Sequence, residues 1–272
     1  MVDKLIGFVG AGVMGGALIG GLLEAGVVGP TQVLAADLDP ARRAHLGERY
    51  GIEVTAENRE VVSSCPTVVL AVKPQVARGL LADLGKEFRT GQTVISIMAG
   101  WEIARLSSFL PPGVKVVRAM PNTPCQIQQG VTVLAYGPGV SEEDRERARR
   151  IFRAVGEVVE LPESLMDAAT AVSGCGPAYV FLFMEALVDA GVKLGLPREA
   201  SRLLTTQTVA GAATMVQRLD LHLAQLKDSV ASPGGATIHA LGVLEEAGWR
   251  GTLIRAASAA WRRTRQLGRK ED

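Results

Sequence analysis

Residues 4–25, KLIGFVGAGVMGGALIGGLLEA, decide the fold of the N-terminal part of the chain. The run at 4–9 is short and apolar, as in a buried strand, and the Ala- and Leu-rich run to about Ala25 suits a helix. Between them lies a match to G-x-G-x-x-G, the pattern of a dinucleotide-binding turn: Gly10, Ala11, Gly12, Val13, Met14 and Gly15. The stretch therefore predicts a strand, a phosphate-binding turn and a helix whose N-terminal N–H groups favour an anion.

Each glycine has a physical role in that setting. Gly10 would form the tight turn, Gly12 would let the backbone approach a pyrophosphate, and Gly15 would let helix and strand pack closely. The stretch between Lys4 and Glu24 is uncharged, which would also suit a signal peptide or a membrane anchor. Because its glycines fall at the spacing of a dinucleotide turn, we expect no membrane segment there and a cytoplasmic protein.

A second apolar run, QVLAAD, ends at Asp37, which lies 22 residues after Gly15. This is close to the spacing of about 20 residues at which an acidic side chain meets the ribose of a bound dinucleotide. Asp37 favours a free 2′-hydroxyl and so NAD, whereas Arg42 and Arg43 could reach the 2′-phosphate of NADP. The residues leave the choice between NAD and NADP open.

Strand-like and helical runs continue to alternate. Apolar runs at 66–74, 92–100, 114–124 and 130–137 alternate with helical runs around 41–50, 75–88, 102–110 and 141–155. Such alternation predicts a doubly wound, mostly parallel sheet of the Rossmann type, whose ligands lie beyond the carboxyl ends of the strands. Three segments follow such ends and are candidates to line the nicotinamide and substrate crevice: Lys73-Pro74, Ala99-Gly100 and Pro121–Pro124.

The second half of the chain carries helical signals. After VVELPE (158–163), long helical runs at 165–195 and 196–219 precede shorter ones at 222–230 and 251–267. Pro162 is the expected boundary between a dinucleotide-binding domain, residues 1–162, and an all-helical domain, residues 163–272. These helices are apolar on more than one face, more than a monomer readily buries, so we expect a homodimer at least.

Composition excludes other classes of protein. The chain is 47% hydrophobic and 21% charged, with a net charge of +1. Its acidic and basic residues are interspersed except in the C-terminal RRTRQLGRK, which suits a solvated helix end, so nucleic acid is not the expected partner. Cys65, Cys125 and Cys175 are widely spaced and odd in number, so they predict neither a disulfide framework nor a zinc site. A reducing compartment fits best. The three histidines are scattered as well, and no bound metal is expected.

The motifs, taken together, resemble the pyrroline-5-carboxylate reductase family over essentially the whole chain. The resemblance rests on FVGAGVMGGAL, AVKP, NTP, SGCGPAY, GVKLGLP and, most specifically, KDSVASPGGATIHALGVLEEAGWRG (227–251). It implies an NAD(P)H-dependent reduction of the cyclic imine 1-pyrroline-5-carboxylate to L-proline, the last step of proline biosynthesis. It also implies a helical domain that dimerises, an active site built between subunits, and larger assemblies of dimers.

The resemblance also assigns residues. It places cofactor contacts on the turn from Gly10 to Gly15 and on Asn58, Ala71, Val72, Lys73 and Pro74, and substrate contacts on Ser232, Gly234, Gly235 and Thr237. Cys175 stands where relatives often carry Ser, so it is not expected to be a nucleophile.

The segment SPGGAT suits a carboxylate. We expect Ser232 to cap a helix, Pro233 to be its first residue, and Gly234 and Gly235 to expose their N–H groups. The substrate carboxylate would bind these N–H groups without an arginine. Thr237 would then hydrogen-bond the imine nitrogen, which is basic enough to take its proton from water. His239 is expected to be structural, and most catalysis to come from orientation.

Two other functions compete with this reading. Related reductases of 3-hydroxy acids would need a lysine on the first long helix of the second domain, and Lys193 lies far along it, beside Gly195. A non-catalytic dinucleotide-binding protein would have no need for Ser232 and Thr237.

Overall fold

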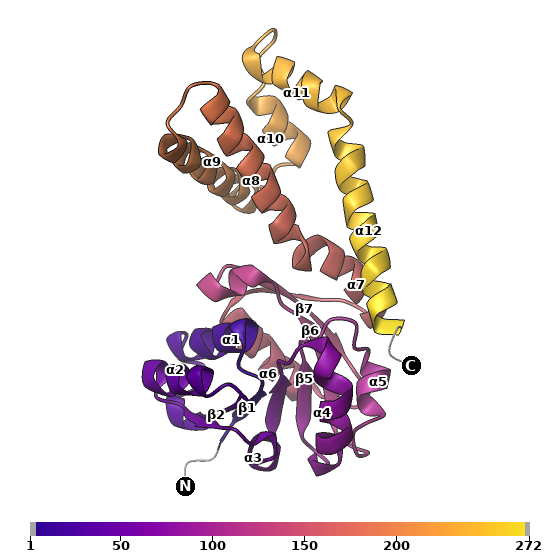
Figure 1. Cartoon of the computed structure of the whole chain (residues 1–272). Helices are drawn as coiled ribbons and strands as arrows, with labels where there is room; N and C mark the ends of the chain where they lie inside the picture. Colours follow the sequence, from indigo (N-terminus) through magenta and orange to yellow (C-terminus); the bar gives the residue numbers. More distant parts are fainter. Residues whose placement is uncertain (1–3, 270–272) are drawn as a thin grey trace. The chain divides into compact units, whose positions relative to one another are not determined.

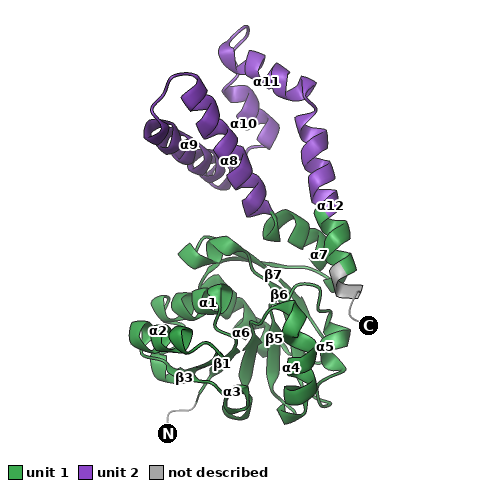
Figure 2. Cartoon of the chain, viewed as in Figure 1, with its two compact units in different colours: residues 1–175, 260–272 green, residues 176–259 purple. Residues whose placement is uncertain are grey.

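The computed structural model describes residues 4–269 and divides into two compact units (Figure 2). The first runs to Cys175 and also takes in the chain from Ala260 onward, and the second is Gly176–Ala259. Each unit has its own architecture, and each is described separately.

The first unit is built on one eight-stranded sheet in the order β3-β2-β1-β4-β5-β6-β7-β8 (Figure 1). All neighbouring strands are parallel except β6 and β7, which pair antiparallel. At the centre, Phe8 of β1 is in register with Ala35 on one side and Val69 on the other. The strands are β1 Ile6–Val9, β2 Val33–Ala36, β3 Glu53–Thr55, β4 Thr67–Leu70, β5 Thr93–Ser96, β6 Lys115–Met120, β7 Gly130–Tyr136 and β8 Gly156–Glu160.

Helices cover both faces of this sheet. They are α1 Val13–Glu24, α2 Pro40–Tyr50, α3 Asn58–Ser64, α4 Ala77–Leu84, α5 Ile103–Ser107, α6 Glu142–Arg153 and α7 Met166–Ala169. Side chains of successive strand residues point to opposite faces of the sheet, so they pack in two different hydrophobic cores. In β1, Phe8 packs with α1, α2 and α6, whereas Val9 packs with α3, α4 and α5. This is the predicted doubly wound fold, and it places the glycine turn at the carboxyl end of β1.

The second unit is all helical, as predicted. It contains α8 Gly176–Lys193, α9 Arg198–Arg218, α10 Leu223–Ser229, α11 Ala236–Glu246 and the first half of α12 Trp249–Arg269. Two of the helices meet through Phe183 and Trp249, whose ring centroids lie 6.0 Å apart. Among the described residues 176–259, none is a fully buried hydrophobic side chain, and Phe181 and Leu182 are more than 60% exposed. This unit therefore needs apolar cover from outside itself.

One long helix predicted in the second half of the chain is divided in the structure. The run at 165–195 is not one helix, because a π-helical turn at Thr170–Gly174 separates α7 from α8. By length and composition the helical segment Glu163–Lys193 could cross a membrane, and only 6% of its most apolar window is buried within the described structure. The N-terminal stretch is strand β1 followed by helix α1.

The compact units also divide at a different residue from the predicted boundary at Pro162. Residues just after it pack with the sheet: Met166 is fully buried, and the Arg118 guanidinium of β6 forms ion pairs with Glu163 at 3.3 Å and Asp167 at 3.2 Å. These contacts fix α7 to the first unit, which is why the contact boundary lies at Cys175.

Candidate active site

The glycine turn has the geometry of a phosphate-binding loop. Gly10 has a φ of +89°, a conformation that L side chains rarely adopt. A Cβ on Gly15 would lie 2.6 Å from the Gly10 carbonyl oxygen, so helix α1 could not pack this closely with a larger residue. A Cβ on Gly12, in contrast, would meet nothing within 4 Å. The φ of Gly10 and the close packing at Gly15 fit the roles predicted for these two glycines, and the open space beside Gly12 leaves room for a ligand.

The N-terminus of α1 is open to an anion. Gly12 is its N-cap residue, and no side chain caps the helix. Its first turn carries no acidic residue. The first N–H groups of a helix carry a partial positive charge, so this end attracts a diphosphate. The described residues therefore fit the dinucleotide that the sequence pattern implies, which supplies hydride to a substrate when it is bound.

Asp37 follows β2 and is fixed against the glycine turn. Its Oδ2 accepts a hydrogen bond from the Ala11 N–H at 2.8 Å, and its Oδ1 accepts one from the Asp39 N–H at 2.9 Å. The side chain is half-buried. The sequence located this acid by its spacing, and the structure adds that its carboxylate is held by backbone groups on both sides.

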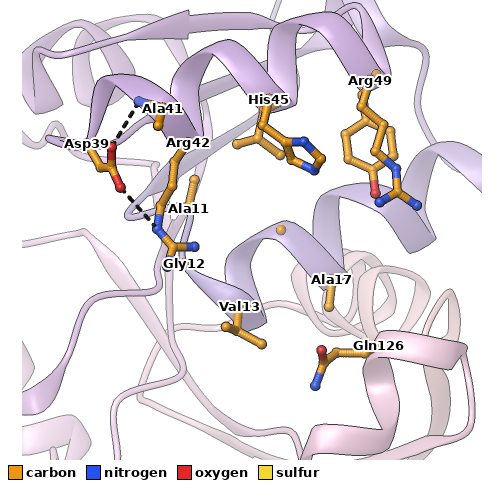
Figure 3. A pocket seen from close by; sticks show the side chains of 13 residues that line it. Ala11, Gly12, Val13, Ala17, Asp39, Ala41, Arg42, His45, Arg49 and Gln126 are labelled. Carbon is orange, nitrogen blue, oxygen red and sulfur yellow. Dashed lines mark hydrogen bonds and ion pairs between the residues drawn. The ribbon is translucent and has the colours of Figure 1, made fainter.

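A cavity of about 490 Å³ extends from the turn along α1 and α2 (Figure 3). Arg42, His45 and Arg49 follow one another along α2 and face Val13 and Ala17 of α1. Gln126 lines the cavity from the segment after β6. Val13 and Arg42 were singled out from the sequence, whereas Ala17, His45, Arg49 and Gln126 were not, because they share a common face only once α1 and α2 are packed.

The remaining predicted cofactor residues follow β4, beside the turn, or β3, at the edge of the sheet. The Ala71 N–H donates to the Val9 carbonyl at 2.8 Å, and the Ala71 carbonyl lies 2.8 Å from where a Gly10 Cβ would stand. The segment Ala71, Val72, Lys73 and Pro74 therefore follows β4 directly against the glycine turn. Asn58 is the first residue of α3, which follows β3 at the edge of the sheet.

Sequence reasoning missed the residue that supports this segment. Trp101, only 2% exposed, donates its Nε1–H to the Pro74 carbonyl at 3.2 Å. It thereby joins the loop after β5 to the loop after β4. Its position after Gly100, at a strand end, was the one available signal.

In the second unit the SPGGAT segment forms a turn before the helix, so the predicted helix start at Pro233 is wrong. The Gly235 N–H donates to the Ser232 carbonyl at 3.0 Å, and Gly234 has a φ of +68°. Pro followed by a glycine of positive φ is the sequence of a type II turn. Helix α11 begins at Ala236. Gly235 is its N-cap residue and uses its own N–H to close the turn.

The free donors therefore lie after Gly234 and Gly235, the two glycines that were expected to expose their N–H groups. The N–H groups that open α11 belong to Ala236, Thr237 and Ile238, and no side chain caps them. The Thr237 side chain lies in this first turn and is exposed. His239 has its Nδ1 2.9 Å from the Gly235 carbonyl, so a proton on Nδ1 would be donated to that oxygen, in line with the structural role expected for it.

Comparison with known proteins gives the family. A family model described as pyrroline-5-carboxylate reductase dimerisation matches residues 163–267, and one described as NADP oxidoreductase, coenzyme F420-dependent, matches residues 5–100. The pyrroline-5-carboxylate reductase of Synechocystis is 42% identical over 97% of this chain and 98% of its own length. That of Methanosarcina acetivorans is 40% identical over 99% of this chain and all of its own.

The chain belongs to the pyrroline-5-carboxylate reductase family. The solved pyrroline carboxylate reductase of Plasmodium falciparum, described with NADP bound, is 35% identical, with a TM-score of 0.89 over 98% of this chain and 99% of its own. The predicted family, fold class and enzyme class, an NAD(P)-dependent pyrroline-5-carboxylate reductase, are thereby confirmed. The matching dimerisation domain makes the chain a homodimer and explains the exposed apolar helices of the second unit.

The structure brings the predicted pyrroline-5-carboxylate reductase site together in two groups. The cofactor residues gather in the first unit, and Ser232, Gly234, Gly235 and Thr237 gather in the second. Within residues 4–269, no group of three or more His, Cys, Asp or Glu side chains could hold a metal ion. Burial raises the pKa of the Cys65 thiol to about 11 and also raises that of Cys125, so neither is a reactive thiolate at neutral pH.

Proposed function

We propose that this chain reduces 1-pyrroline-5-carboxylate to L-proline with NADPH or NADH. The observation that carries the proposal is the uncapped first turn of α11, whose N–H groups follow the Ser232–Gly235 turn. That turn contains no charged residue, so nothing competes with a small carboxylate for these donors. The relative described with NADP bound supports the dinucleotide.

Different residues of the chain bind the cofactor, the substrate carboxylate and the imine nitrogen. The turn from Gly10 to Gly15, with Asp37, Asn58 and the segment Ala71–Pro74, binds the dinucleotide, which supplies the hydride. The α11 N-terminus and the Ser232 hydroxyl bind the substrate carboxylate, and Gly234 gives the turn its shape. Thr237 hydrogen-bonds the imine nitrogen, which keeps the ring carbon electrophilic and correctly oriented.

The chain needs no strong general acid in this scheme. A cyclic imine takes its proton from water near neutral pH, and the α11 turn offers only hydroxyls and amides around it. His239 is engaged with the Gly235 carbonyl rather than with a substrate position. The rate enhancement would therefore come from orientation of the imine against the hydride donor.

A single proline substitution at the start of α11 tests the carboxylate site. Ala236→Pro removes one N–H at the first helical position, where proline is well tolerated. Gly235 has φ −77° and ψ 172°, the extended conformation that a residue before proline prefers. Loss of one charge-assisted hydrogen bond of about 1.5–3 kcal/mol should raise KM for pyrroline-5-carboxylate by roughly 10-fold or more.

The control is Ala240→Ser on the same helix, which should leave KM unchanged. An unchanged KM in a folded Ala236→Pro enzyme would contradict the carboxylate site. Failure of the wild-type protein to oxidise NADH or NADPH on addition of pyrroline-5-carboxylate would contradict the function itself.

We further propose a cytoplasmic protein with no membrane or nucleic-acid partner and no metal requirement. Its dimers would assemble further, and its functional domains would meet near residue 162, where the matching dimerisation model begins. Light scattering at several concentrations measures the assembly. Retention of activity in a chelator tests the metal.

A further inference from the structure

We infer that Asp37 makes this enzyme discriminate between its two possible cofactors in favour of NADH. The inference rests on the proposed function, because it concerns the same dinucleotide site. It starts from the position of one carboxylate, which lies beside the glycine turn after β2. In a Rossmann fold the adenosine ribose of the dinucleotide lies at this point.

The Asp37 carboxylate cannot easily turn away from that point. The Ala11 N–H holds Oδ2 at 2.8 Å, and the Asp39 N–H holds Oδ1 at 2.9 Å. The Asp37 N–H itself donates to the Thr55 carbonyl of β3 at 3.2 Å, which fixes the backbone as well. A fixed anion accepts a hydrogen bond from a 2′-hydroxyl and repels a 2′-phosphate, which carries nearly two negative charges.

The nearby arginines do not reverse this preference, because they have other partners. The Arg43 guanidinium donates to the Asp37 carbonyl at 2.7 Å and to the Leu38 carbonyl at 3.0 Å, so it braces the loop backbone. Arg42 lies 3.8 Å from the Asp39 carboxylate (Figure 3). A phosphate at this loop would therefore meet two carboxylates, Asp37 and Asp39, and one shared arginine.

The cations farther along the cavity are also engaged or set back. Arg49 places its guanidinium carbon 5.0 Å from the centre of the Tyr50 ring. His45 and Arg49 lie about one and two turns beyond Arg42 on α2, away from Asp37. We assign Arg42 to the adenosine end of the dinucleotide and Asp37 to the choice between hydroxyl and phosphate.

Binding of ligands that cannot react tests the inference directly. Isothermal titration of the full chain with adenosine diphosphate ribose and with its 2′-phosphate gives the two Kd values without any catalysis. We expect the unphosphorylated ligand to bind at least about 10-fold more tightly, which corresponds to about 1.4 kcal/mol. Equal or tighter binding of the 2′-phosphate by the wild-type protein would overturn the inference.

Variants identify the residue responsible. Asp37→Ser, and the isosteric Asp37→Asn as a second variant, should shift the ratio of the two Kd values toward the 2′-phosphate by roughly 10-fold. Asp83→Ser removes an exposed acid from α4 and should leave the ratio unchanged. If both Asp37 variants fold and keep the wild-type ratio, Asp37 is not the discriminating residue.

The result is independent of whether the proposed function holds. If neither cofactor supports reduction of pyrroline-5-carboxylate, the proposed function is wrong. The two Kd values still test the role of Asp37 in that case. Conversely, kcat/KM for NADH and NADPH should follow the same ratio if both proposals are correct.

Discussion

The side-chain amide of Asn122 donates a hydrogen bond to the Ser173 carbonyl at 3.1 Å, and its oxygen accepts one from the Val131 N–H at 2.9 Å. One buried side chain thus joins the loop after β6, the start of β7 and the π-helical turn before α8. π-Helical turns tend to occur at functional sites, since they interrupt the regular ladder of hydrogen bonds. Asn122 satisfies a backbone oxygen in this turn.

Replacing Asn122 should therefore loosen this junction. Asn122→Ala would leave the Val131 N–H and the Ser173 carbonyl without their partner, at a cost of about 1–3 kcal/mol of unfolding free energy. Urea unfolding at a fixed protein concentration measures the loss. Gln126→Ala, at an exposed position on the same segment, is the control and should cost far less. Equal stabilities for the two variants would contradict a role for Asn122 at this junction.

The three glycines of the turn should separate binding from stability. Gly12→Ala meets nothing within 4 Å in the free protein, so Tm without ligand should stay within a few degrees while affinity for NAD(P)H falls about 10-fold. Gly15→Ala would place a Cβ 2.6 Å from the Gly10 carbonyl oxygen. This substitution should lower both the Tm and the affinity for NAD(P)H. Thermal unfolding and fluorescence titration of the same samples give the two readouts. A Gly15→Ala protein with unchanged Tm would refute the packing role.

The Thr237 hydroxyl should affect the reaction and not the cofactor. Thr237→Ala is expected to lower kcat/KM for pyrroline-5-carboxylate by roughly 10-fold or more, about 1.4 kcal/mol, and to leave the Kd for NADPH nearly intact. Thr237→Ser keeps the hydroxyl and should recover most of the activity. If Thr237→Ala reduces the imine at the wild-type rate, Thr237 has no part in the chemistry.

Gly235→Val would be a less selective test of the carboxylate site. A Cβ on Gly235 would lie 2.3 Å from the Ser232 hydroxyl oxygen, so valine would displace the Ser232 side chain as well as obstruct the carboxylate. Ala236→Pro is the more selective change.

Asp144 makes stability depend on pH. Burial alone would raise the pKa of this carboxyl, but hydrogen bonds from Lys115, at 2.6 Å, and from Ser141 outweigh burial and hold its pKa well below 3.8. A folded pKa below the unfolded one means that this stabilisation is full above about pH 4 and is lost as the pH falls through the folded value.

Asp144→Asn should therefore lower unfolding free energy by about 2 kcal/mol at pH 7 and by less at pH 3. Denaturant titrations of both proteins at the two pH values give the comparison. If the two proteins differ in unfolding free energy by the same amount at pH 7 and pH 3, Asp144 acts by packing and not by charge.

Arg118 should be the most sensitive ionic residue of the first unit. It is 4% exposed and pairs with Glu163 and Asp167, and the Glu163 Oε1 also accepts the Ile103 N–H at 2.7 Å. Arg118→Met leaves two carboxylates unpaired and should cost about 3 kcal/mol of unfolding free energy. Arg198→Met, which breaks an exposed pair with Asp189, should cost no more than about 1 kcal/mol.

Much of the fold could be predicted from the sequence because its signals are local. The strand, glycine turn and helix of the first 25 residues depend on neighbours in the chain, and so does the spacing to Asp37. The strand β3, Glu53–Thr55, and the helix α3, Asn58–Ser64, were missed because three and seven residues are too short to show a period.

The site was harder to predict, because its details depend on backbone geometry. Pro233 suited a helix start and a type II turn equally well by residue type, and only the φ of Gly234 decides between them. Likewise, the spacing located Asp37, but its hydrogen bond to Ala11 forms only when β2 and the glycine turn meet. Arg118 carries no local signal, since its partners lie 45 and 49 residues away. Asn122 follows a predicted strand end, but its bond to Ser173, 51 residues away, could not be predicted from the sequence.

Residues 176–259 have no apolar interior of their own, so the fraction of the enzyme that is folded and dimeric depends on protein concentration. When the folded helices depend on a second subunit, dilution favours dissociation, and each tenfold drop in concentration removes about 1.4 kcal/mol of apparent stability. Stock solutions and nanomolar assays then contain different populations, and turnover in a dilute cuvette would decay with time after mixing. Rates for this enzyme have meaning only together with the concentration at which they were obtained.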